Sequence, residues 1–97
     1  MSIPDRSTAF PSNHAPADGS ACFSIHAMCA PGTLPRLLAP FAQRSLVPDR
    51  WHSIVSSDGE LQVDVQVDGL PTRDADLIAA KLRALIDVRT VLICRKG

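Results

Sequence analysis

Apolar and polar residues alternate along two segments, 21–28 and 60–67, with the period of two that is typical of β-strands. The pattern is clearest in 60–67, where one face carries Leu61, Val63, Val65 and Val67 and the other carries Glu60, Gln62, Asp64 and Gln66. One apolar and one polar face indicate a sheet that helices cover on one side only.

Two segments have apolar residues at helical spacing instead. The first helix is predicted over 34–45 with Thr33 as its N-cap, and its buried stripe is Leu34, Leu37, Leu38, Phe41 and Ala42. Pro40 is expected to kink this helix because it lacks a backbone N–H. The second helix is predicted over 73–86, and its inward residues are Ala75, Ile78, Leu82, Leu85 and Ile86.

The segments 46–56 and 88–95 complete the predicted structure as strands, although the pattern of 88–95 does not decide which face is inward. Pro48 indicates an edge strand, and Ser57-Asp58-Gly59 a hairpin turn. The order βαββαβ predicts an α+β, ferredoxin-like sandwich: a four-stranded antiparallel sheet with two helices on one face. Right-handed crossovers place the first and third strands centrally and the other two at the edges.

Residues 1–20 have no apolar period and are rich in Pro, Ser, Ala and Asp, so we expect a flexible tail before one small domain, 21–97. A domain of this size buries only about 60% of its unfolded surface. Because 45% of the chain is apolar, we expect a second subunit to cover part of it. The polar face of 60–67 argues against stacking of two sheets, so the expected homodimer pairs through an edge strand.

Charge and cysteine content exclude several classes of function. Ten basic and ten acidic residues give a formal net charge of zero, and without a basic stripe we expect no nucleic-acid binding. No segment has the length of a membrane span or the pattern of a signal peptide, so we expect no membrane association. Three cysteines without paired spacing indicate a reducing, cytoplasmic location.

The segment Cys29-Ala30-Pro31-Gly32-Thr33-Leu34 is the predicted effector-binding site. It joins the first predicted strand to the first predicted helix. Gly32 has no Cβ to block a ligand from the backbone, and a helix N-terminus favours a carboxylate or another anion.

Other candidate chemistry is sparse. His14 lies in the predicted tail and His26 and His52 on strands that should not be neighbours, so no metal site is expected. Cys22 and Cys94 lie on strands that should pair; small buried apolar side chains are the first interpretation, and a disulfide or soft-metal site the alternative. No catalytic residue is predicted, although Cys29 at a helix N-terminus is an alternative nucleophile.

Trp51, on the predicted edge strand, suits either a subunit contact or the core.

Three stretches of the chain follow a known pattern. Residues 30–38 (APGTLPRLL) are similar to a Pro/Gly-x-Leu-x-Arg-Val-Leu helix entry, and Gln43-Arg44-Ser45-Leu46 to an Arg-Gly-aromatic helix exit. Residues 81–88 (KLRALIDV), followed by 91–94 (VLIC), are similar to Leu-x-Lys-Leu-Val-Asp-Val-x-x-Val. With these stretches the chain resembles the ACT domain, a small-ligand regulatory module, and within it the small regulatory subunit of acetolactate synthase.

This resemblance implies a non-catalytic subunit that docks on a large catalytic subunit and activates or stabilises it. Thiamine diphosphate, FAD and magnesium would belong to that large subunit, and no cofactor is expected in this chain. In the family an amino acid binds where the first loop meets a neighbouring subunit. Cys29 stands where the family has Asn, and Ser45 where it has Gly, so we expect regulation by docking more than by sensing valine. A stand-alone ACT-type sensor of an amino acid or related metabolite is the alternative.

Overall fold

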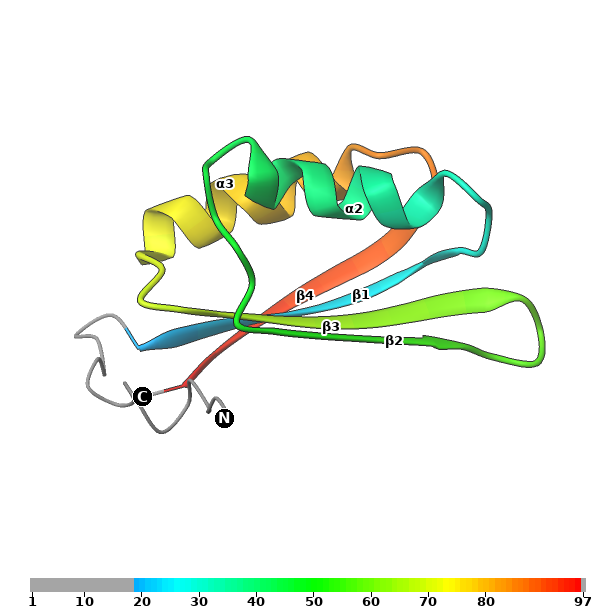
Figure 1. Cartoon of the computed structure of the whole chain (residues 1–97), viewed down its shortest axis with the longest axis horizontal. Helices are drawn as coiled ribbons and strands as arrows, with labels where there is room; N and C mark the ends of the chain where they lie inside the picture. Colours follow the sequence, from blue (N-terminus) through cyan, green and yellow to red (C-terminus); the bar gives the residue numbers. More distant parts are fainter. Residues whose placement is uncertain (1–18, 97) are drawn as a thin grey trace, which may run out of the picture.

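Four strands and two helices follow one another in the order βαββαβ in the computed structural model, which describes residues 19–96 (Figure 1). The elements are β1 (Ser20–Met28), α2 (Thr33–Ala42), β2 (Arg50–Val55), β3 (Glu60–Asp68), α3 (Thr72–Arg83) and β4 (Val88–Lys96). The predicted ferredoxin-like fold is thus confirmed. Most of the predicted tail, residues 1–18, lies outside the described residues.

The strands form one antiparallel sheet in the order β2-β3-β1-β4. This confirms that the first and third strands are central and the other two are edges. The register of β1 with β3 is unbroken from Ser20 opposite Asp68 to Met28 opposite Glu60. Between β1 and β4 the register shifts once, at His26/Ala27.

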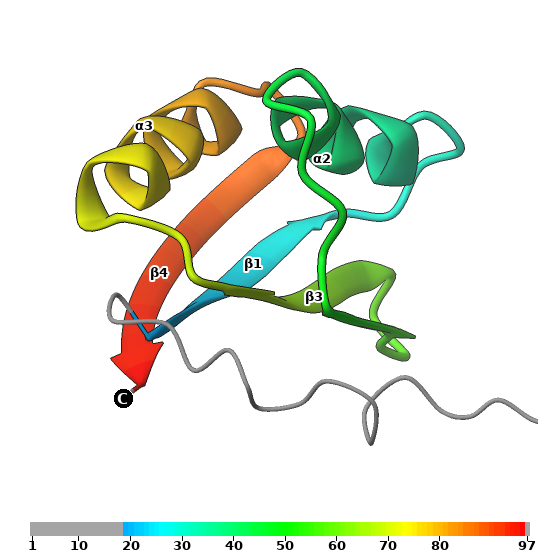
Figure 2. The same cartoon turned by 60° about the vertical axis from the view of Figure 1, so that its left-hand side comes forward.

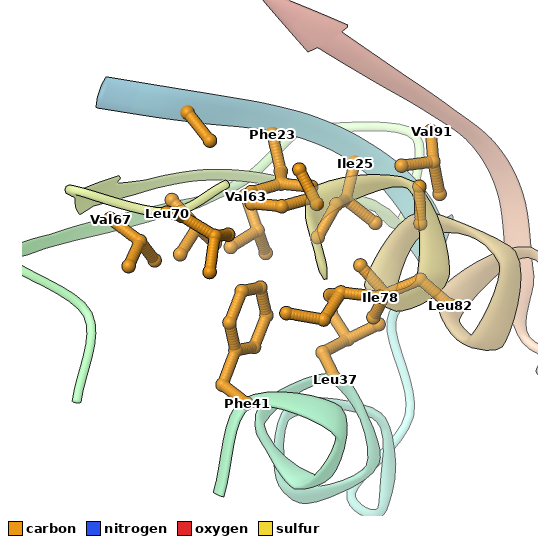
Figure 3. Close-up of a cluster of buried hydrophobic side chains, with 14 of the residues drawn as sticks. Phe23, Ile25, Leu37, Phe41, Val63, Val67, Leu70, Ile78, Leu82 and Val91 are labelled. Atoms are coloured by element: carbon orange, nitrogen blue, oxygen red, sulfur yellow. The ribbon is translucent and has the colours of Figure 1, made fainter. Parts of the chain in front are cut away.

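Both helices lie on the same side of the sheet (Figure 2). The apolar core is formed by side chains of the sheet and of both helices. Figure 3 shows Leu37 and Phe41 reaching from α2 toward side chains of the sheet, beside Ile78 and Leu82 of α3. The rings of Phe23 and Phe41 meet edge to face, with centroids 5.3 Å apart, which is a favourable geometry for aromatic pairs.

The first helix is rotated relative to the prediction. Its buried residues are Thr33, Leu37, Pro40 and Phe41, whereas Leu34 and Leu38 are 40% and 43% exposed. The helix starts at Thr33, and the stripe at 33, 37, 40 and 41 keeps helical spacing one position earlier than expected. The predicted N-cap was also wrong: Gly32 is the N-cap, without a side-chain cap.

Both helices end earlier than predicted. Ala42 is the last residue of α2, and α3 ends at Arg83. After α3 the N–H groups of Leu85 and Val88 donate to carbonyls three residues back, at 3.1 Å each. The chain has therefore left the helix before Ile86, whose side chain is 92% exposed rather than buried.

The edge strands also differ in detail from the prediction. β2 begins at Arg50 instead of residue 46, and its pairing is preceded by a hydrogen bond from the Asp49 N–H to the Gln66 carbonyl, 2.8 Å. Pro48 has no N–H to contribute before that point. On β4, Val91 is buried and Val88 and Ile93 pack against the core. Trp51 packs against the core as well.

The turn after α2 places Ser45 in the left-handed region, with φ 61°. The Ser45 N–H donates to the Ala42 carbonyl and the Leu46 N–H to the Phe41 carbonyl, the pattern of a Schellman motif. This motif requires a residue with positive φ, which explains the glycine expected here from the family pattern. For serine, which has a Cβ atom, the same conformation is sterically unfavourable.

We therefore expect Ser45→Gly to raise the free energy of unfolding by about 1 kcal/mol, because glycine relieves the left-handed strain. Urea unfolding followed by circular dichroism measures the change. The control is Ser57→Gly in the β2–β3 turn, since Ser57 does not have positive φ. A gain of equal size in both variants would contradict the interpretation.

Candidate functional site

The loop Cys29–Leu34 lies where three parts of the chain meet. It follows β1, and the Cys29 N–H donates to the Gly59 carbonyl of the β2–β3 turn, 3.3 Å. The Met28 N–H donates to the carbonyl of Asp87, 2.8 Å, in the connection between α3 and β4. These two hydrogen bonds hold the end of β1 to the β2–β3 turn and to the α3–β4 connection, at the point where the loop begins.

Thr33 anchors the loop from inside the protein. It is fully buried, and its hydroxyl lies 2.9 Å from the Met28 carbonyl and 3.4 Å from Oδ2 of Asp87. A buried hydroxyl needs such a partner because desolvation without a hydrogen bond is costly. Thr33 is therefore a structural tie between β1 and α2, not a side chain open to a ligand.

Arg36, one turn along α2, forms an ion pair with Asp87. The carboxylate is 18% exposed and the guanidinium side chain 52% exposed. The guanidinium also lies over Gly32: a Cβ placed there would be 2.9 Å from Nη2 of Arg36. The guanidinium of Arg36 therefore occupies the space in which a side chain at position 32 would lie.

The outer surface of the loop remains open. Cys29, Ala30, Pro31 and Leu34 are exposed, and Gly32 is half-buried. Within residues 19–96, the N–H groups of Gly32 and Leu34 have no hydrogen-bond acceptor. Two unpaired donors at the positive end of a helix suit a carboxylate.

A shallow groove of about 260 Å³ continues from Arg36 between α2 and α3. Its floor is mainly apolar and its rim carries two positive charges; the lining residues are Arg36, Ala39, Pro40, Gln43, Lys81, Ala84 and Leu85. The groove suits an apolar group with an attached anion more than it suits a free inorganic ion.

The β2–β3 turn next to the loop has its own hydrogen-bond network. The Ser56 hydroxyl donates to the carboxylate of Asp58, which also accepts the Glu60 N–H at 3.2 Å. These bonds, that of Ser56 first, lower the pKa of Asp58 below its ordinary value. The Asp58 carboxylate therefore stays charged, and accepts these hydrogen bonds, to lower pH than a free aspartate would.

The remaining candidates do not form a site. His26 and His52 lie on β1 and β2, which β3 separates, and His14 lies outside the described residues. Among residues 19–96 no three His, Cys, Asp or Glu side chains converge as metal ligands. The exposed Cys29 makes no side-chain hydrogen bond to a base there. In the same range no helix has the length and apolarity of a membrane span.

The predicted approach of Cys22 and Cys94 is confirmed, because the two residues are directly opposite in the β1–β4 register. The expectation that both are buried was wrong: Cys94 is exposed and Cys22 half-buried. The reason is their position on the face of the sheet that the helices do not cover.

Comparison with known families identifies the domain. A family model described as "ACT-like domain" matches residues 14–95. The chain belongs to the ACT-like domain family. A search of curated proteins found no match.

Several solved structures share the fold, and one of them is an ACT domain. The crystal structure of the ACT domain from GTP pyrophosphokinase of Chlorobium tepidum is 17% identical, with a TM-score of 0.69, over 80% of this chain and 100% of that one. A homoserine dehydrogenase from Thiobacillus denitrificans is 18% identical, with a TM-score of 0.66, over 91% of this chain but 24% of that one. An uncharacterized protein, TM1266 from Thermotoga maritima, is 9% identical, with a TM-score of 0.67, over 81% of this chain and 98% of that one.

Membership in this family indicates a regulatory module as the general role. ACT domains are regulatory modules that generally bind amino acids and generally do not catalyse reactions. Sequence reasoning located the loop but assigned no role to Arg36 or Asp87, which are 51 residues apart. The signal was present, because each lies in one of the stretches similar to the regulatory subunit.

We expect Asp87→Asn to lower the free energy of unfolding by about 1 kcal/mol, because a charged acceptor of two hydrogen bonds becomes neutral. Hydrogen exchange should also accelerate over residues 28–36 and remain unchanged in β3. The control is Asp76→Asn on the exposed side of α3, with a loss of less than about 0.5 kcal/mol. Equal effects of both variants on residues 28–36 would exclude Asp87 as an anchor.

Proposed function

We propose that this chain is a non-catalytic regulatory subunit of acetolactate synthase that activates or stabilises the large catalytic subunit. One observation carries this proposal: Arg36 and Asp87 belong to the two longest stretches that resemble the regulatory subunit, and they form an ion pair in the fold. Residues far apart in the sequence thus combine into one unit at the loop. A combined pattern of this kind is more specific than either stretch alone.

The apolar surface of the helices supports docking on a larger partner. Leu34 and Leu38 are one turn apart on α2, and both are well exposed, as are Leu77 and Ile86. Exposed apolar side chains at helical spacing are typical of a surface that a partner covers. The large subunit, with thiamine diphosphate, FAD and magnesium, would supply all of the chemistry.

A small amino-acid ligand fits the same site. The unpaired N–H groups of Gly32 and Leu34 and the Arg36 guanidinium suit a carboxylate, and the Asp87 carboxylate suits an ammonium group. Cys29 supplies no amide for the ligand, unlike the family's Asn, so we expect weak binding or none for valine. This site also supports the second candidate, a stand-alone ACT-type sensor of an amino acid or related metabolite.

We propose further that the chain forms a homodimer through an edge strand. The outer face of β3 is polar, with Gln62 and Asp64 exposed, which disfavours stacking of two sheets. Both edges, β2 and β4, have backbone groups available for pairing in the described fold. We also propose a cytoplasmic location, where the synthase substrates would be found.

Co-purification with an acetolactate synthase large subunit tests the leading proposal. We expect a complex in which acetolactate forms several times faster than with the large subunit alone. Leu38→Glu should abolish the complex while leaving the isolated domain folded, because the residue lies on the exposed side of α2. Gln62→Glu, which adds the same negative charge on the outer face of β3, should leave the complex intact.

No complex and no change in rate with the unmodified chain would exclude the regulatory-subunit proposal. Calorimetry with valine, leucine and isoleucine then separates the second candidate. Binding of one of them by the isolated chain, together with failure to join the synthase, would favour the stand-alone sensor.

Light scattering tests the homodimer. We expect the mass of two chains at micromolar concentration, since a stable edge-strand pairing keeps two copies together. A single-chain mass at high concentration would contradict edge-strand pairing.

A further inference from the structure

Cys22 and Cys94 form a pair that no part of the regulatory role uses. They lie on neighbouring antiparallel strands, β1 and β4, and each is the direct partner of the other in the register. The one register shift between these strands is at His26/Ala27, and pairing is regular from Ser20 to His26. The pairing of the two cysteines is thus part of an unbroken ladder.

Both side chains lie on the face of the sheet opposite the helices. Along β1, Ala21, Phe23, Ile25 and Ala27 are almost fully buried, so the alternation of a strand turns Cys22 to the other face. A residue directly opposite in the register shares that face, which places Cys94 beside Cys22. Oxidants in solution reach this face, since Cys94 is exposed and Cys22 half-buried.

The spacing of directly opposite residues suits a covalent bond. In antiparallel pairs the Cα atoms are about 4.5–5.5 Å apart, and disulfides accept Cα separations of about 4.4–6.8 Å. We propose that Cys22 and Cys94 are a redox modification site that forms a reversible cross-strand disulfide. This site is distinct from the loop Cys29–Leu34 and does not depend on the proposed function.

The oxidant is a low-molecular-weight disulfide of the glutathione class. The thiolate of Cys94, the more exposed cysteine, attacks one sulfur of that disulfide, forms a mixed disulfide and releases one thiolate. The thiolate of Cys22 then attacks Sγ of Cys94 and releases the second. Two protein thiols lose two electrons and two protons, one disulfide becomes two thiols, and excess reduced thiol reverses both steps.

The bond would join the first strand of the domain to the last. The segment that the disulfide closes into a ring contains α2, β2, β3 and α3, so the bond restricts the unfolded chain strongly. It also fastens the edge strand β4 to the central strand β1. Oxidation therefore makes the domain more stable and holds this edge against separation.

Mass spectrometry of the full chain after equilibration with oxidised and reduced glutathione tests the proposal. We expect one intramolecular disulfide and an increase in the midpoint of thermal unfolding of about 10 °C or more. Trypsin should yield peptide 90–95 joined to peptide 7–36. Because peptide 7–36 contains both Cys22 and Cys29, the assignment requires variants.

Cys29→Ser is the matched control and should keep the bond, since Cys29 lies seven residues along from Cys22, about 23 Å in an extended strand. Cys22→Ser and Cys94→Ser should each lose it, stop at mixed disulfides and lose the thermal shift. Only mixed disulfides in the Cys29→Ser variant, or bonds solely between two molecules, would overturn the proposal. A joined peptide that persists in Cys22→Ser would overturn it too.

Discussion

The pairing of β1 with a strand on each side is the constraint on which the rest of this domain depends. β1 is central, between β3 and β4, and its inward side chains are nearly inaccessible to solvent. A shift of one residue would turn Phe23 and Ile25 out of the core and bring polar neighbours in. The register is therefore strongly specified. It fixes where β1 ends, and with that the point at which the loop to α2 begins.

The sheet and the order of elements could be predicted because they depend on local alternation. β3 shows this best, since Leu61, Val63, Val65 and Val67 all face the core as expected. The inward face of β4 could not be predicted, for a physical reason. Val88 and Val91, three residues apart, both contact the core because the register shift inserts an extra residue between them. Alternation fails at such an irregularity.

Both helices were predicted, and so was the inward face of α3, with Ala75, Ile78 and Leu82 buried. The rotation of α2 and the length of both helices were not predicted. Leucines at 34, 37 and 38 are equally apolar, and only the start of α2 at Thr33 decides that Leu37 alone is buried. Thr33 itself is a polar residue in the buried stripe, and its partners come from β1 and from Asp87. No local pattern contains that information. The candidate loop was located from Gly32, but the charges beside it required the fold.

Gly32 and Arg36 together have a mechanical consequence. The Arg36 guanidinium lies over Gly32 and is paired with the carboxylate of Asp87. The carbonyl of Asp87 in turn accepts a hydrogen bond from the N–H of Met28, the last residue of β1. A carboxylate arriving at the loop would compete with Asp87 for the same cation. Such competition would weaken the ion pair that links α2 to the connection between α3 and β4. Occupancy of the loop would thus be transmitted to the connection that leads directly into the edge strand β4.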